Sequence, residues 1–69
     1  MNKRIIYQLG MELRYAAHAL MLWNDGEYRC DVRIRRARTE GLIVLEVDSL
    51  ELANKIVTAI RCKVAVKEI

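Results

Sequence analysis

The chain contains 69 residues with a formal net charge of +3 at pH 7, and 54% of its residues are hydrophobic. This length limits the chain to a single domain, residues 1–69, and the apolar fraction excludes a disordered protein. The apolar runs are too short and too interrupted to span a membrane, and no secretory signal precedes them, so we expect a cytoplasmic protein.

The first third of the chain predicts a strand followed by a helix. Residues 4–9 alternate between two sets of side chains, as in a short strand, and Gly10 offers a break after them. A single long helix is the alternative, because the apolar residues of segment 5–23 also recur at helical spacing. An interior glycine costs a helix about 1 kcal/mol relative to alanine, which favours the strand and a turn. Residues 11–23 lack Pro and Gly and precede turn-forming residues 24–26, so they predict the helix itself.

The middle of the chain predicts a β-hairpin. Residues 28–37 place apolar and charged side chains on alternate sides, which indicates a half-buried strand. Residues 42–47 are rich in aliphatic and β-branched side chains, and the connection 38–41 ends in Gly41, which suits a hairpin loop. A loop of this length matches apolar with apolar and charged with charged side chains across the strands. The expected pairs are Val32 with Val47, Arg33 with Glu46, and Ile34 with Leu45.

The last part of the chain predicts a second helix. Asp48 and Ser49 are suitable N-cap residues, and Glu51 follows Asp48 at the spacing of a capping box. The end of this helix leaves two alternatives open, because residues 62–66 alternate like a strand and also continue the helical stripe. No Gly, Asn or Pro separates the helix from residue 62, which favours a helix that continues to about residue 66.

Together these elements predict an α+β fold. An antiparallel sheet of about three strands carries two helices on one face, in the order β-α-β-β-α. A final strand would complete a ferredoxin-like βαββαβ arrangement.

The sequence contains no residue pattern that is typical of an enzyme, a metal site or a cofactor site. Cys30 and Cys62 lack metal-binding spacing, and both lie in apolar segments where a buried free thiol is favoured over a disulfide. The single histidine, His18, lies on an apolar helix face, and the single serine, Ser49, is explained as a helix cap. The three glycines form no nucleotide-binding motif. We therefore expect no catalytic activity, no cofactor and no metal.

Positive charge is concentrated in and around the first strand of the hairpin. Arginine binds phosphate through a bidentate fork, so this strand is a candidate nucleic-acid contact, to the backbone and not to base sequence. The alternative is a solvated face that protects an edge strand from mispairing. No aromatic pair of an RNA-recognition sheet accompanies the arginines, which favours the alternative. The candidate contacts are Arg29, Arg33, Arg35, Arg36 and Arg38.

The helix at residues 11–23 is apolar nearly all round. A helix packed on one sheet buries a single stripe, so a second apolar face needs another surface to cover it. The second helix repeats the pattern. The alternative is that both stripes face the sheet and one another, but the shortness of the chain favours a protein partner. The expected interface residues are Met11, Tyr15, His18, Leu22, Leu52 and Ile56.

Three segments, residues 28–38, 41–48 and 49–61, carry a resemblance to a known family. An arginine-bearing strand, an aliphatic strand that ends in an acidic residue, and a helix that opens in Ser-Leu resemble the small Pcc-type dimerising subunits of the KEOPS complex. The resemblance implies a non-catalytic subunit of the machinery that makes threonylcarbamoyl-adenosine in tRNA. It also implies that the chain pairs with a like chain through the hairpin strands, docks its helices on the catalytic subunit and brings its arginines near tRNA.

The function expected from these observations is that of a scaffold or dimerisation subunit of a multiprotein complex. Homodimer and heteromeric complex both remain open. The alternative is a small basic nucleic-acid-binding module that uses the arginine-rich strand. A small enzyme ranks third, because no residue pattern names a reaction.

Overall fold

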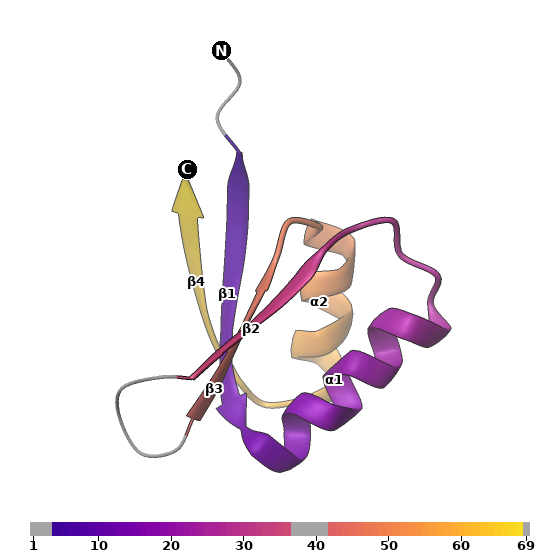
Figure 1. Ribbon diagram of the computed structural model, residues 1–69, viewed down its shortest axis with the longest axis vertical. Helices are drawn as coiled ribbons and strands as arrows, with labels where there is room; N and C mark the ends of the chain where they lie inside the picture. The colour runs from indigo at the N-terminus through magenta and orange to yellow at the C-terminus, as the bar shows by residue number, and fades with distance from the viewer. Residues whose placement is uncertain (1–3, 37–41, 69) are drawn as a thin grey trace.

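The structure, a computed structural model, describes residues 4–36 and 42–68, which form a four-stranded sheet with two helices (Figure 1). The elements in chain order are β1 (Ile5–Glu12), α1 (Leu13–Asp25), β2 (Val32–Arg36), β3 (Leu42–Val47), α2 (Leu50–Ala59) and β4 (Lys63–Glu68). The strands lie in the order β2-β3-β1-β4, and every neighbouring pair is antiparallel. This is the ferredoxin-like arrangement, so the expected α+β fold is confirmed and includes the final strand.

Both helices pack over the two central strands. α1 and α2 contact β1, β3 and each other, and Figure 1 shows them on one side of the sheet. The buried apolar core consists of Leu9, Met11, Ala16, Ala19, Leu45, Val47, Leu52, Ala53, Ile56 and Ile60. The edge strands β2 and β4 lie outside this cover, and neither has a buried residue within its range. The two edges of the sheet are therefore more exposed than its centre.

The first strand is longer than the sequence predicted. β1 continues through Gly10 to Glu12, where a turn was expected, and α1 begins at Leu13 instead of residue 11. Gly10 pairs with β3 on one side and β4 on the other, and these two ladders outweigh the weak strand propensity of glycine. The strand carries Met11 into the core, where its side chain is 2% exposed. The alternative of one long helix over residues 5–23 is wrong.

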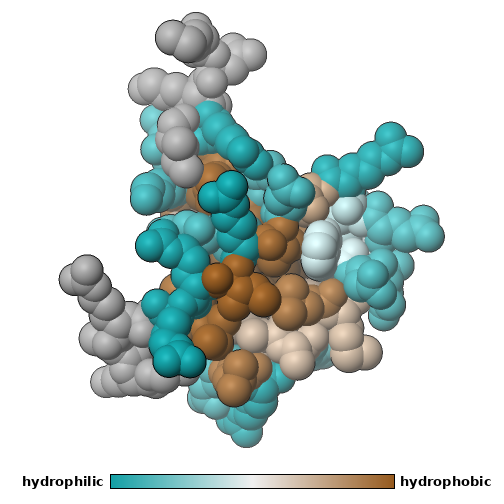
Figure 2. Space-filling view, viewed as in Figure 1, coloured by the Kyte–Doolittle hydropathy of each residue, from teal (hydrophilic) through white to brown (hydrophobic). Residues whose placement is uncertain are grey.

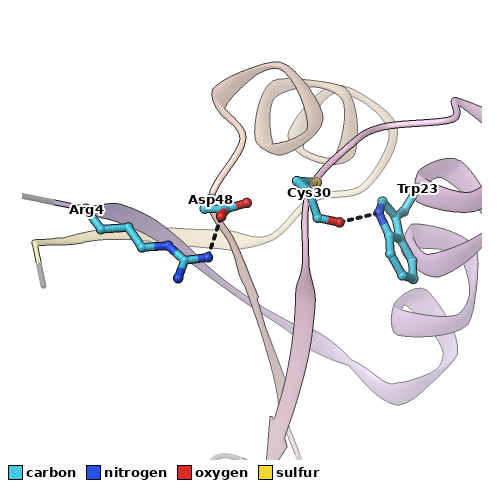
Figure 3. A network of polar contacts seen from close by, with 4 residues as sticks. All are labelled: Arg4, Trp23, Cys30 and Asp48. Carbon is cyan, nitrogen blue, oxygen red and sulfur yellow. Dashed lines mark hydrogen bonds and ion pairs between the residues drawn. The ribbon is translucent and has the colours of Figure 1, made fainter.

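The hairpin of β2 and β3 has the predicted register. The observed pairs include Val32 with Val47, Arg33 with Glu46, and Ile34 with Leu45. β2 begins later than predicted, because the chain before it is held against α1. The Trp23 Nε1–H group donates a hydrogen bond of 3.1 Å to the carbonyl oxygen of Cys30 (Figure 3). The predicted loop, residues 38–41, lies outside the described residues.

The second helix begins as predicted, with Ser49 as its N-cap. The Leu52 backbone N–H donates to Ser49 Oγ at 3.2 Å, which satisfies one of the free amides of the first turn. Asp48 does not cap the helix. Its carboxylate forms an ion pair with Arg4 instead, which joins the start of β1 to the end of β3 (Figure 3).

The favoured prediction for the end of the chain is wrong. α2 ends at Ala59, because Ile60 adopts extended backbone angles, and residues 63–68 form β4 instead of continuing the helix to about residue 66. These residues pair with β1 along the whole of their length. A complete ladder on the free side of a central strand replaces the hydrogen bonds that a longer helix would have made.

Candidate functional site

The predicted partner interface does not form one surface. Met11, Leu52 and Ile56 lie in the core, with 2%, 0% and 1% of their surface exposed. The prediction that these three contact a partner is wrong, because the chain's own sheet and helices cover them. Leu22 is partly buried and packs against the same core. The members that remain exposed, both on α1, are Tyr15 and His18.

α1 nevertheless carries apolar side chains on its outer side. Leu13 is 70% exposed and Met21 is 62% exposed, and the intervening Ala17 is exposed as well. Residues four apart share one helix face, so these three form an outer stripe. Helix α1 is therefore apolar on two faces, as its composition indicated, but its outer face is made of other residues than those predicted.

A second apolar surface lies along β4, on the helix-bearing side of the sheet. Val64 pairs with Leu9, and Val66 with Tyr7, so both valines point to the same side as the core. The helices cover the central strands only, which leaves Val64 44% exposed and Val66 64% exposed. Ile5 of β1 points to the same side and is 42% exposed. Ile5, Val64 and Val66 are termed the β4 apolar strip.

The opposite edge of the sheet repeats this situation on a smaller scale. Ile34 of β2 lies opposite the buried Leu45 and is 57% exposed. Figure 2 shows apolar surface in the middle of the view, where β2 and α1 face each other, with hydrophilic side chains on both of its sides.

The other face of the sheet, which carries no helix, is positively charged at both edges. The even-numbered side chains of β1 and β3 point away from the core, and their partners in the edge strands share this open face. In β2 these partners include Arg33 and Arg35, and in β4 they include Lys63 and Lys67. All four side chains are exposed.

The predicted nucleic-acid contacts are thus only partly brought together. Two of the arginines of β2 lie on the open face, whereas Arg36 pairs with Ile43 and points to the side of the core. Arg29 is exposed in the connection before β2, and Arg38 lies outside the described residues. The two lysines of β4 were missed, because their segment was interpreted as helix.

A cluster of polar side chains occupies the centre of the open face. Gln8 Nε2 donates a hydrogen bond of 2.8 Å to Glu46 Oε2, and Arg35 Nη1 lies 3.6 Å from the same oxygen. The hydrogen bond from Gln8, together with the positive charge of Arg35, lowers the pKa of Glu46, although burial opposes them. Glu46 is therefore ionised and partnered, and it offsets part of the charge of β2.

Two shallow hollows flank this cluster on the open face. Each has a volume of about 220 Å³, and both are lined by Gln8 and Val44. One extends to Lys63 in β4, and the other to Arg35 in β2. No described residue that points to this face is aromatic, so the face offers charge and shape to a ligand but no stacking platform.

The two cysteines are free and only partly buried. Burial raises the pKa of both thiols, and the nearby carboxylates of Asp48 and Asp31 raise that of Cys30 further. Within the described residues, no group of three or more His, Cys, Asp and Glu side chains could hold a metal ion. In the same part of the chain, neither helix is long and apolar enough to cross a membrane.

Comparisons with known proteins define the fold and nothing further. No family model matches the chain, and no curated protein matches it. Among solved structures, the chain is similar to the de novo designed protein Foldit4, with a TM-score of 0.52 and 13% sequence identity. The match covers 94% of this chain and 92% of the designed one. At this level of identity the likeness is one of fold alone.

Proposed function

We propose that the chain is a non-catalytic scaffold subunit of a multiprotein complex and that it binds another protein through the β4 apolar strip. The observation that carries the proposal is the exposure of Ile5, Val64 and Val66 beside a fully buried core. A partner that covers this strip removes apolar surface from water, which is the main driving force of most protein association.

The strip contributes to binding but does not account for it alone. Full burial of one such side chain contributes about 1.5–3 kcal/mol, so covering three that are partly exposed contributes roughly 2–4 kcal/mol. A micromolar complex requires about 8 kcal/mol. The remainder must come from further contacts, and the free backbone edge of β4 is the one that adjoins the strip.

The Pcc-type resemblance gives this proposal a concrete complex, the KEOPS complex that makes threonylcarbamoyl-adenosine in tRNA. Its support is the element order strand, helix, strand, strand, helix, which β1 to α2 follow. β4 goes beyond that order. A mixing experiment with the purified catalytic subunit, read by gel filtration, tests this part, and separate elution at micromolar concentration would exclude it.

A matched pair of variants tests the scaffold proposal itself. The tagged chain is used to capture proteins from native extract, which are identified by mass spectrometry. Val64→Ser with Val66→Ser removes apolar surface from the strip, and Leu13→Ser with Met21→Ser removes a similar surface from α1. We expect the first pair to lose a protein that the second pair retains. Equal capture by both variants, or no specific capture by the wild type, would refute the proposal.

A second candidate function is contact with the nucleic-acid backbone through the open face. It rests on the placement of Arg33 and Arg35 at one edge and Lys63 and Lys67 at the other, with hollows between them. A single strand laid across the sheet can reach both edges. Without aromatic side chains, such binding is electrostatic and insensitive to base sequence.

This candidate is tested by tRNA affinity across a salt series. Arg33→Ala with Arg35→Ala should weaken binding and reduce the slope of log affinity against log salt by about one unit or more. Lys55→Ala is the control, because this lysine is exposed on α2, which packs on the opposite side of the sheet. Wild-type affinity and slope in the double variant would exclude the open face as the contact.

A further inference from the structure

β4 is an edge strand that exposes every one of its six residues. It pairs with β1 on one side only, and no other strand of the described chain lies along its outer side. The outward amide and carbonyl groups of an edge strand form a template for another strand. Its exposed length is typical of a strand in a globular protein, so an added strand would gain a complete ladder.

The two faces of β4 have different chemistry. Val64 and Val66 point to the helix-bearing side, whereas Lys63, Ala65 and Lys67 point to the open face. A strand added to this edge would place alternate side chains beside the valines and beside the lysines. The edge therefore favours a partner strand with apolar side chains on the helix-bearing side and negatively charged side chains on the open face.

A second copy of this chain fits that edge poorly. Two copies related by a two-fold axis pair antiparallel, with their helices on the same side. The register that sets Val64 opposite Val66 of the second copy also sets Lys63 opposite Lys67, and it does so twice. Like charges directly opposite each other destabilise a sheet. Every symmetric register gathers four lysines on one face, and on that face β4 supplies no carboxylate.

Pairing of β4 with the other edge of a second copy meets the same obstacle. The open-face side chains of β2 include Arg33 and Arg35, so they would face the lysines of β4. Charged residues on edge strands are a common protection against pairing between identical sheets. Both free edges of this sheet carry that protection with the same sign of charge.

We propose that β4 accepts a strand from a different protein, with carboxylates opposite Lys63 and Lys67 and apolar side chains opposite Val64 and Val66. This inference rests on the scaffold function proposed above and names the mode of binding, strand addition, and the chemistry of the partner segment. Main-chain hydrogen bonds supply affinity in this mode, and alternate side chains supply specificity.

A short peptide with Glu-Val-Thr-Val-Glu at its centre is the direct probe. The pattern reads the same in both directions, so it suits a parallel and an antiparallel approach. Backbone amide signals of the isotope-labelled full chain are followed by NMR during titration. We expect the shifts to concentrate on residues 63–68, with slower amide exchange there, and with little change along β2.

Charge reversal then tests complementarity. Lys63→Glu with Lys67→Glu should weaken binding of the acidic peptide by about tenfold, and should favour a peptide with Lys-Val-Thr-Val-Lys at its centre. Arg33→Glu with Arg35→Glu makes the same charge change at the other edge and should leave the affinity unaltered. A Val-Glu-Thr-Glu-Val peptide has the same composition in the wrong alternation and should bind more weakly.

Several results would overturn the inference. Equal binding of the acidic, basic and rearranged peptides would remove the specificity on which it depends. Shifts confined to residues outside β4 would place the contact elsewhere. If no peptide perturbs the lysines but an oligouridylate perturbs them together with β2, the open face is a nucleic-acid contact and the strand-addition proposal is wrong.

The failure of this inference is distinguishable from the failure of the scaffold function. If the peptides do not bind, yet capture of a protein still depends on Val64 and Val66, the partner covers the apolar strip without adding a strand. If capture is independent of these valines and the peptides bind, the edge is functional but the strip is not the main contact. Absence of both overturns both proposals.

Discussion

Gln8 and Glu46 lie opposite each other in the central ladder of β1 and β3, and the amide of Gln8 donates a hydrogen bond of 2.8 Å to the Glu46 carboxylate. This bond is the leading cause of the lowered pKa of Glu46. The pair joins two strands whose sequence separation is large. The pH dependence of stability that arises from Glu46 therefore depends on the contact between β1 and β3.

Gln8→Leu should raise the pKa of Glu46 and destabilise the fold by about 1 kcal/mol at pH 7. Because the folded pKa lies below the unfolded value of about 4.3, ionised Glu46 stabilises the fold above that value. The stabilisation is lost as the pH falls through the folded pKa. Urea unfolding over a pH series should show a difference at neutral pH that narrows in acid. A difference independent of pH would contradict this account.

Gly10→Ala should be neutral or stabilise the fold by up to about 1 kcal/mol, because alanine loses less conformational entropy in a strand. A Cβ atom at this position would have the Lys63 carbonyl oxygen as its nearest neighbour, at 4.0 Å. Gly26→Ala is the contrasting variant. Its Cβ would overlap the ring of Tyr28, with Cδ2 at 2.7 Å, and should cost about 1–3 kcal/mol. Thermal unfolding of both proteins measures the contrast, and a larger loss of stability in Gly10→Ala than in Gly26→Ala would contradict this account.

Ser49→Ala should cost about 1 kcal/mol, because it removes the oxygen that accepts the Leu52 amide at the start of α2. Thr58→Ala in the same helix is the matched control. The Thr58 hydroxyl donates to the Asn54 carbonyl oxygen, which is already part of the helix, and alanine has the higher helix propensity. Chemical denaturation should separate the two variants. Equal loss in both would mean that Ser49 does not act as a cap.

The thiols of Cys30 and Cys62 should react slowly with disulfide reagents near neutral pH. Burial raises the pKa of both, so the reactive thiolate is scarcer than in a free cysteine and access is limited. The reaction rate should rise with pH and should increase sharply in urea. Each thiol is followed in a single-cysteine variant, Cys30→Ala or Cys62→Ala. Reaction of the folded protein as fast as that of the unfolded chain would contradict the observed burial.

The hairpin was predictable because its information is local. A short connection and matched side chains in neighbouring segments fix the register of β2 and β3, and one capping residue, Ser49, fixes the start of α2. The extension of β1 through Gly10 and the formation of β4 depend instead on ladder partners far along the chain. The periodicity of a short segment does not contain that information. In both segments the spacing of apolar residues therefore fits a helix as well as a strand.

The candidate surfaces, too, were predictable from the sequence only in part. Composition indicated that α1 is apolar on two faces, but the face that turns inward depends on where the helix starts. A start at Leu13 instead of residue 11 moved Met11 into a strand and left Leu13 and Met21 outside. The basic character of β2 was legible from the sequence. Its counterpart in Lys63 and Lys67 appeared only once β4 was placed at the opposite edge.

The position of β1 also has a consequence for how the chain reaches its native state. β1 is made first, yet both of its ladders, with residues 42–47 and with residues 63–68, are made from segments synthesised much later. During synthesis, β1 therefore cannot form either ladder until the segment that supplies its partner strand has been made. Such non-local pairing gives a high contact order and slow folding for a small domain. The local hairpin of β2 and β3 is the natural place for folding to begin, and the β1–β4 ladder is the natural last step.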